Sequence, residues 1–280
     1  MVSCAYSGSN FQVDMRQDHR PNRGLTLIEV LVVIAIIGVL LAMVVPSLSR
    51  GKFNARVRTC ANNYRQLALA ATMYAQDDSG GRLPNFALPT ESSQLMTFQN
   101  LYPWLVDLQM LEAMEDHGIA KPQLWFCPLR NRWRDTADTF RNVNGQSLES
   151  IADLVSYYRD IQEAKYAFLD LNWWVPRALE GFSTLTYPDP SLIPTRSQTP
   201  WPTKMDDSSL STRPIISDWM MGSKISSADG IEKASGAHAV GGKVQNCNSA
   251  YGDGRVETRS ANQIRWELRI TEDENRYIFY

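Results

Sequence analysis

Glu29 is an acidic residue whose position calls for a chemical role, because its surroundings are apolar. It lies in the run Leu25–Val45, in which it is the only charged side chain. A carboxylate costs about 2.5–3.5 kcal/mol at the centre of a membrane helix and less near an end, and such residues pair with a partner. A cut between Gly24 and Leu25 would create an amine, and pairing of that amine with Glu29 of a neighbouring copy would offset the cost.

A second group of candidates lies in the C-terminal part of the chain, where His238 precedes Asp253-Gly254. An Asp-Gly pair followed by alternating residues is typical of a hairpin turn between strands. The motifs HExxH and GxSxG are absent from the sequence, so neither a zincin nor a serine hydrolase is indicated. A paired-carboxylate hydrolase has no local signature, so an anchored enzyme stays among the alternatives.

The cysteines and a pair of acidic residues are the remaining candidates. Asp77 and Asp78 lack the alternating ligands of an EF-hand loop, so a polar turn that ends a helix is favoured over a cation site. A zinc site is not expected, because no CxxC or Cys/His cluster occurs among the four cysteines, Cys4, Cys60, Cys127 and Cys247.

The element that carries Glu29 is an apolar segment of membrane length. Residues 25–45 are 21 residues, mainly Leu, Ile, Val and Ala, and a helix of that length spans roughly 30 Å, the thickness of a bilayer core. A buried core helix is one alternative. A secretory signal is another, but its run is about 7–15 residues and ends in a small-residue cleavage site. The sequence therefore predicts a transmembrane helix. Arg16, Arg20 and Arg23 precede it, which predicts a cytoplasmic N-terminus and an outward-facing remainder.

An amphipathic segment follows over residues 46–77. Apolar side chains recur there at alternating spacings of four and three from Phe53 to Tyr74, which is typical of a helix with one face on a core. Pro46 would normally kink or end a helix, yet the stripe resumes after it. We therefore expect one long N-terminal helix, half in the membrane and half packed on a head domain.

Residues 78–280 are predicted to form an α+β head domain with an antiparallel sheet. Residues 213–219 and 263–270 have the pattern of strands, residues 101–114 that of a short helix, and residues 125–128 that of a strand end closed by proline. The chain has 280 residues and a formal net charge of −2, which gives no electrostatic argument for nucleic acid as a partner.

The stretch Arg23-Gly24 followed by LTLIEV resembles the class III signal of type IV prepilins and type II secretion pseudopilins. In that family a prepilin peptidase cleaves after the glycine and methylates the new N-terminus, and the acid at the fifth mature position is needed for assembly. The resemblance implies that residues 1–24 are a leader, that Leu25 becomes the methylated N-terminus, and that Glu29 acts in assembly. It also implies a pilin-like fold, a single pass through the inner membrane, and helix contacts with like subunits in a secretion or pilus machine.

Parts of the head resemble a large group of prepilin-like proteins, in the stretch TCANNYRQLALAATMYAQDDSGGRLPN, in Trp-Phe-Cys-Pro, and in the segment containing His238, Asp253 and Gly254. The resemblance gives no role to that last segment. Because Cys60 and Cys127 both recur in the family pattern, it favours a disulfide between them, although the sequence alone leaves the pairing with Cys247 open. No cofactor is implied other than calcium, which major pseudopilins bind in the head and for which Asp77 and Asp78 are the candidates.

The sequence thus predicts a non-enzymatic structural subunit of a pseudopilus or type IV pilus. One alternative is a minor pilin or adhesin in which exposed Trp173, Trp174 and Trp201 bind a glycan or a protein; buried tryptophans would instead indicate plain core. The other is a membrane-anchored enzyme or binding domain, which would show a deep polar cleft and no processing at Gly24.

Overall fold

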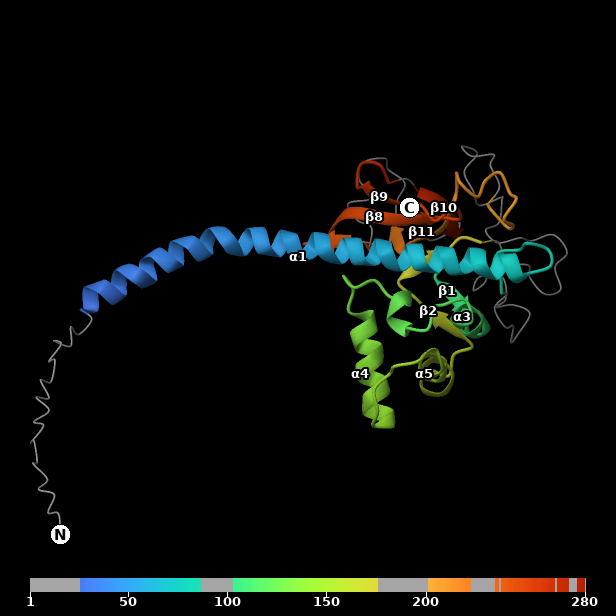
Figure 1. Ribbon diagram of the computed structural model, residues 1–280, viewed down its shortest axis with the longest axis horizontal. Coiled ribbons are helices and arrows are strands. Elements are labelled where there is room, and N and C mark those ends of the chain that lie inside the picture. Colours follow the sequence, from blue (N-terminus) through green and yellow to red (C-terminus); the bar gives the residue numbers. More distant parts are fainter. Residues whose placement is uncertain are drawn as a thin grey trace, which may run out of the picture. The chain divides into compact units, whose positions relative to one another are not determined.

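The computed structural model describes residues 26–86, 103–175, 201–222, 235–236, 238–264, 266–271 and 276–279. The chain divides into two units between Arg50 and Gly51, and the first helix, α1 (Leu27–Asp77), contributes to both (Figure 1). The predicted leader, Gly24 and Leu25 lie outside the described residues.

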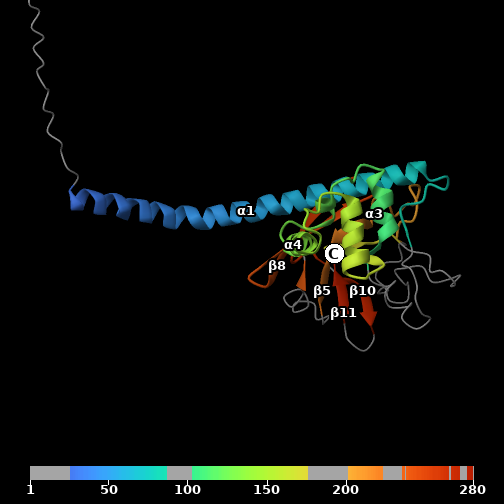
Figure 2. The ribbon, with the colours of Figure 1, turned by 90° about the horizontal axis from the view of Figure 1, so that it is seen from below.

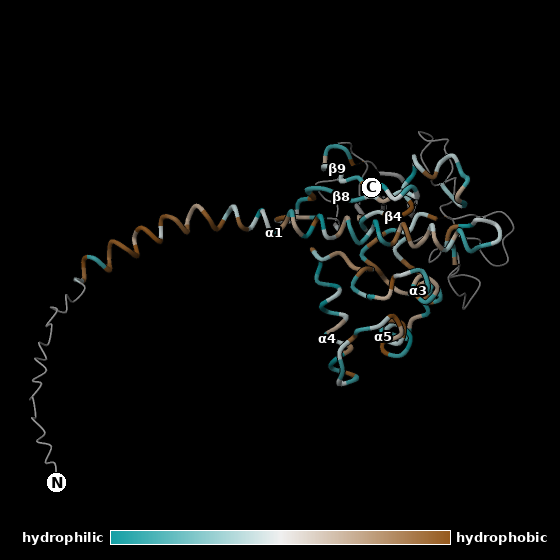
Figure 3. Tube along the Cα trace, in the orientation of Figure 1, coloured by the Kyte–Doolittle hydropathy of each residue, from teal (hydrophilic) through white to brown (hydrophobic). Residues whose placement is uncertain are grey.

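Helix α1 confirms the long N-terminal helix. It runs for 51 residues and continues through Pro46, although proline removes one main-chain donor from the helical ladder. Its first half, Leu27–Arg50, is apolar around most of its circumference, as the brown stretch of Figure 3 shows. An 18-residue window of α1 is long and apolar enough to cross a membrane.

The second half of α1, Gly51–Asp77, has the predicted amphipathic pattern. This half of the helix runs along the head (Figure 2), and its buried face joins the hydrophobic core there. The buried side chains repeat at intervals of three or four residues, which places them on one face of the helix. They include Val57, Cys60, Tyr64, Leu67, Ala71 and Ala75.

The described residues of the head form three antiparallel sheets. The sheet that positions the candidate site has the order β3-β4-β8-β7, with β9 also paired to β8. Its strands are β3 (Leu171–Trp173), β4 (Pro214–Asp218), β7 (His238–Val240), β8 (Lys243–Tyr251) and β9 (Val256–Ser260). The register sets His238 opposite Asn246 and Ser217 opposite Ser249.

The other two sheets are smaller or lie later in the chain. One pairs β1 (Leu105–Asp107) with β2 (Tyr166–Phe168), and the other has the order β10-β11-β5-β6. The latter consists of β5 (Met220–Gly222), β6 (Ser235–Gly236), β10 (Trp266–Thr271) and β11 (Arg276–Phe279). The predicted strands near residues 213–219 and 263–270 are confirmed by β4 and β10, and with them the α+β class.

Short helices complete the head, and two of them correct the predictions. The helix predicted over residues 101–114 begins only at Leu108, because Leu105–Asp107 pair as a strand and the Asp107 side chain caps the helix by accepting from Gln109 N–H. The strand end predicted at residues 125–128 is wrong. Pro122 starts a 3₁₀ helix that ends at Trp125, as proline's fixed φ favours, and residues 126–128 belong to no strand. These helices are α3 (Leu108–Glu115), η1 (Pro122–Trp125), α4 (Arg132–Asn144), α5 (Ile151–Ser156) and the π-helical η2 (Tyr157–Ile161).

Candidate functional site

Glu29 forms a capping box with Thr26 at the start of α1. The main-chain N–H and the hydroxyl of Thr26 donate to Glu29 Oε2 at 2.8 and 2.9 Å, and Glu29 N–H donates to Thr26 Oγ1 at 3.3 Å. A capping box satisfies main-chain donors that a helix start leaves unpaired. Glu29 therefore has a partner in its own chain, which the sequence analysis missed, although Thr-x-x-Glu before an apolar run is the signature of this motif.

The first half of α1 presents a large apolar surface. Its large apolar side chains, from Leu27 to Leu48, are each at least 49% exposed. Soluble monomers seldom expose a contiguous apolar surface of this extent, which marks a site for lipid or for other protein. A helix satisfies its own main-chain hydrogen bonds, so this segment is suited to both surroundings.

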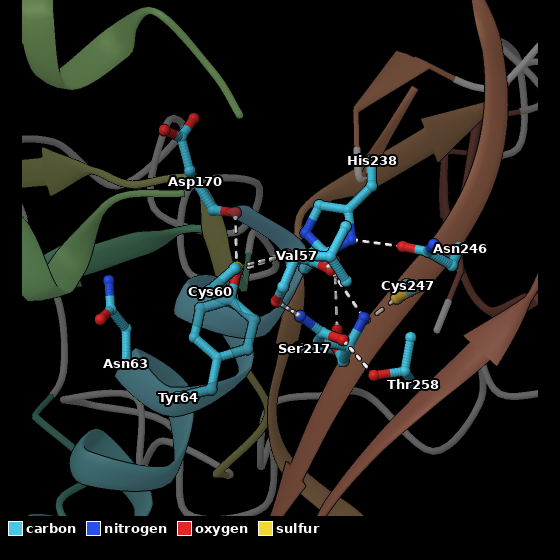
Figure 4. A network of polar contacts seen from close by, with 12 residues as sticks. Val57, Cys60, Asn63, Tyr64, Asp170, Ser217, His238, Asn246, Cys247 and Thr258 are labelled. Carbon is cyan, nitrogen blue, oxygen red and sulfur yellow. Dashed lines mark hydrogen bonds and ion pairs between the residues drawn. The ribbon is translucent and has the colours of Figure 1, made fainter. Parts of the chain in front are cut away.

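A second site lies inside the head, where four buried polar side chains converge. They are Cys60 on α1, Cys127 after η1, Asp218 at the end of β4 and His238 at the start of β7. One potential ligand atom from each lies within 4.8 Å of the other three, and every side chain is at most 1% exposed. Figure 4 shows Cys60 and His238 facing each other across this network. We call these four residues the Cys2AspHis cluster.

Asp218 is held by donors from two elements of the head. The hydroxyl of Tyr64 donates to Oδ1 at 2.7 Å, and the main-chain N–H of Asn248 donates to Oδ2 at 2.6 Å. The Cys60 thiol also donates to Oδ1, at 3.3 Å. Burial alone would raise the pKa of Asp218, but the positive charge of His238 and these hydrogen bonds lower it.

His238 is oriented by the side chain of Asn246 on the neighbouring strand β8. Its Nδ1 lies 2.5 Å from Asn246 Oδ1, and an amide oxygen can only accept, so Nδ1 carries a proton. Nε2 points at Asp218 Oδ2 from 3.3 Å, without the geometry of a hydrogen bond. Burial lowers the pKa of His238, but the Asp218 carboxylate and the Cys127 sulfur together raise it to about 11.

The two cysteines of the cluster are free and buried. The neighbouring Cys60 thiol and His238 lower the pKa of Cys127 to about 7 against the effect of burial. Burial raises the pKa of the Cys60 thiol well above its usual range. The two residues predicted to form a disulfide are therefore neighbours in the head, and the disulfide itself stays a prediction.

Two comparisons with known proteins match part of the chain. The family model described as the prokaryotic N-terminal methylation motif matches residues 19–45. Residues 19–45 thus carry a prepilin-type N-terminal motif. Type II secretion system core protein G of Pseudomonas aeruginosa is 36% identical over 76 residues, which are 27% of this chain and 49% of that protein. The chain thus spans about half the length of this curated relative. No solved structure matches the chain.

The segment that matches the family model includes Gly24, Leu25 and Glu29, the three residues predicted to act in processing and assembly. It ends before Cys60, so the family model does not reach the Cys2AspHis cluster. The cluster could not be predicted from the sequence, because its donors come from four segments, and Cys60 and Asp218 are separated by 158 positions. No spacing rule connects such residues.

The structure separates the residues of the segment His238…Asp253-Gly254. His238 is buried in the cluster, whereas Asp253 is exposed in the turn between β8 and β9, and the predicted hairpin is confirmed. Asp253 Oδ1 accepts from Arg255 N–H at 2.9 Å. Gly254 has φ +81°, and a Cβ there would lie 3.2 Å from Leu69 Cδ2 of α1. Asp253 and Gly254 therefore shape a turn that packs against α1.

The acidic pair after α1 lies in the predicted polar turn. Asp78 accepts from the guanidinium and the main-chain N–H of Arg82 and from Gly80 N–H. The hydrogen bonds from Arg82 lower the pKa of Asp78. Asp77 Oδ2 lies 3.1 Å from His117 Nε2. Both carboxylates thus have protein partners, and calcium binding at this turn stays a prediction.

The tryptophans on which the adhesin alternative depends belong to the core. Trp173 and Trp174 are fully buried and Trp201 is 5% exposed. Trp174 and Trp201 stack at 4.7 Å between ring centroids, and Trp173 Nε1 donates to the carbonyl of Pro84. This is the outcome that indicates plain core.

A surface pocket of about 530 Å³ lies beside the turn between β8 and β9. It is lined by Ala61, Asn62 and Arg65 of α1 and by residues 253–256. Its charged side chains, Arg65, Asp253 and Arg255, are exposed, so this pocket is not the deep polar cleft that the enzyme alternative requires.

Proposed function

We propose that this protein is a prepilin-like structural subunit. It is inserted in the inner membrane, cleaved after Gly24 by prepilin peptidase, methylated at Leu25, and assembled with like subunits into a pseudopilus or type IV pilus. The observation that carries the proposal is the exposed apolar first half of α1 with Glu29 in its first turn. The match of residues 19–45 to the methylation motif supports it.

The first half of α1 has a different neighbour before and after assembly. Before assembly, lipid surrounds it, because its apolar window has the length of a bilayer core and its main-chain hydrogen bonds are internal. After assembly, the same side chains pack against the helices of neighbouring subunits. The basic residues Arg16, Arg20 and Arg23 keep the N-terminus in the cytoplasm, and the head faces outward.

Glu29 has one role within the chain and another between chains. Within the chain, its carboxylate completes the capping box with Thr26. Between chains, it pairs with the methylated amine of Leu25 on an adjacent subunit. In apolar surroundings such a pair fixes the register of two helices, because a displaced helix would leave one charge unpaired.

The test separates these two roles of Glu29 in the full chain, expressed with a prepilin peptidase and a pilus or secretion assembly system. Glu29→Ala should be cleaved like wild type but give at least a tenfold lower yield of sheared filaments, because the intermolecular pair is lost. Thr26→Val is the control: it removes the hydroxyl contacts of the capping box and keeps the acid, so filament yield should stay near wild type.

Intact mass reports cleavage, and immunoblotting of the sheared fraction reports assembly. A wild-type filament yield from Glu29→Ala would refute the pairing with the amine of Leu25. An equal loss of filaments in Thr26→Val and Glu29→Ala would assign the whole effect to the capping of α1.

A further inference from the structure

We propose that the Cys2AspHis cluster is a structural zinc site of the head. Its ligands are Cys60 Sγ, Cys127 Sγ, one carboxylate oxygen of Asp218 and His238 Nε2. The site does not depend on the role of the N-terminal segment, because all four ligands lie beyond Arg50, in the second unit of the chain.

The donors and their separations fit a tetrahedral zinc ion. Thiolate, imidazole and carboxylate are the usual protein ligands of zinc, with bonds of about 2.0–2.3 Å, so neighbouring donors in a tetrahedral site lie about 3.3–3.8 Å apart. In the head, Cys60 Sγ lies 3.3 Å from Asp218 Oδ1, and His238 Nε2 lies 3.3 Å from Asp218 Oδ2. All four ligand atoms lie within 4.8 Å of one another. Side-chain shifts of about 1 Å are therefore enough to surround an ion.

His238 Nε2 is the atom that points most directly to a ligand. The His238 side chain is fully buried and Nε2 makes no hydrogen bond, although it faces the other three donors. Buried polar atoms without a partner are rare and call for an explanation such as an ion. Asn246 Oδ1 accepts from Nδ1 on the other side of the ring, so a ring that binds a metal as neutral imidazole would do so through Nε2, which faces the cluster.

Residues outside the cluster orient its ligands through hydrogen bonds, as the residues around a metal site usually do. A metal-bound histidine usually donates its second N–H to an oxygen, and a metal-bound carboxylate is itself hydrogen-bonded. In this way Asn246 Oδ1 accepts the second N–H of His238. The hydroxyl of Tyr64 and the main-chain N–H of Asn248 donate to the carboxylate of Asp218. Both side chains are thus oriented before any ion binds.

The charges of the cluster favour a cation at its centre. The carboxylate of Asp218 and two cysteine sulfurs meet in a fully buried site, and buried anions require a nearby positive charge. A zinc ion supplies that charge and allows both sulfurs to bind as thiolates.

The burial of the cluster makes the site structural. Four protein ligands fill a tetrahedral site, whereas a catalytic zinc keeps one position open for water or substrate. The ligands connect α1, the segment after η1, β4 and β7. Zinc would therefore fasten the second half of α1 to the sheet, and it would bind only the folded head, so its binding adds to the stability of the fold.

Two other states of the cluster compete with zinc binding. One is a disulfide between Cys60 and Cys127, which would consume both sulfur ligands. The other is a metal-free pair of Asp218 and His238 beside two free thiols. The experiment distinguishes zinc from both by measuring metal content, thiol state and ligand geometry in the same protein.

The first measurement is zinc per chain, by mass spectrometry of the elements, on the full chain purified in detergent without chelators. One zinc ion per chain is expected. Cys127→Ser and His238→Gln should retain at least tenfold less. Cys247→Ser is the matched control and should keep its zinc, because Cys247 is an equally buried free cysteine outside the cluster.

The second measurement keeps the proposal testable if the variants fail to fold. Wild-type protein is stripped with a chelator and titrated with Co²⁺, which should give the intense visible bands of tetrahedral cobalt and the near-ultraviolet thiolate-to-cobalt absorption. Both should saturate at one ion per chain and disappear when Zn²⁺ is added.

The proposal is overturned if wild-type protein carries no zinc and develops no such cobalt spectrum. This holds whether peptide mapping finds a disulfide between Cys60 and Cys127 or two free thiols. Equal zinc content in wild type and Cys127→Ser would overturn it as well.

Discussion

The two halves of α1 belong to one helix but obtain their stability from different surroundings. In the first half, Leu27–Arg50, apolar side chains cover most of the circumference and stay exposed; Ile36 is 55% exposed. In the second half, Gly51–Asp77, one apolar face is buried in the head, and Leu67 is fully buried. The difference shows that the apolar surface of the first half is left uncovered by its own chain, whereas the apolar face of the second half is buried by it.

Truncating one large side chain in each half sharpens this comparison. These two variants should show the largest difference in the free energy of unfolding of the head. Leu67→Ala should lower the free energy of unfolding of the head by about 2–5 kcal/mol, because it removes buried methyl groups and leaves a cavity. Ile36→Ala should change it by less than about 0.5 kcal/mol, as is usual for positions without buried contacts.

The measurement is denaturant unfolding of the full chain in detergent, followed by tryptophan fluorescence. Leu69→Ala is a control within the second half, because Leu69 is 44% exposed, and it should cost less than Leu67→Ala. Equal losses from Ile36→Ala and Leu67→Ala would show that the two halves are stabilised in the same way, and the comparison would fail.

A smaller effect is expected where the turn between β8 and β9 contacts the second half of α1. Gly254→Ala should lower the free energy of unfolding by about 1–2 kcal/mol, because alanine is unfavourable in the left-handed backbone conformation. The loss should be larger still because the new Cβ would lie 3.2 Å from Leu69 Cδ2. Gly242→Ala is the control, since Gly242 has φ +79° and a Cβ there would meet no atom within 4 Å. It should show the backbone cost alone.

The double variant Gly254→Ala/Leu69→Ala tests the contact itself in the same unfolding assay. If the contact contributes, the second substitution should recover part of the cost of the first, as coupled neighbours do. Strict additivity would limit the role of Gly254 to the backbone of its turn and would remove this link between the hairpin and α1.

Periodic and local signals were enough to predict much of the fold. The apolar run and the stripe from Phe53 predicted α1, and the Asp253-Gly254 pair predicted the β8–β9 hairpin. The errors in the predicted elements arise where a local feature, a proline or a helix-capping side chain, outweighs the apolar pattern. Pro122 starts a 3₁₀ helix where a strand end was expected, and Asp107 caps a helix that was placed several residues too early.

The candidate sites differ in how far the sequence could predict them. A single acid in an apolar run singles out Glu29, but its contact with Thr26 in the same chain was not predicted. The Cys2AspHis cluster was not accessible to sequence reasoning. Asp218 looked like an ordinary strand residue, and only the pairing of β4, β7 and β8 with the packing of α1 brings it to Cys60 and His238.

The measurement that tests the central claim most directly is the intact mass and N-terminal sequence of the protein from membranes, with and without a co-expressed prepilin peptidase. The account predicts a peptidase-dependent chain that begins at N-methylated Leu25. An intact chain that begins at Met1 in both samples would contradict it. The first half of α1 would then be a plain membrane anchor, and the function would have to be sought in the head.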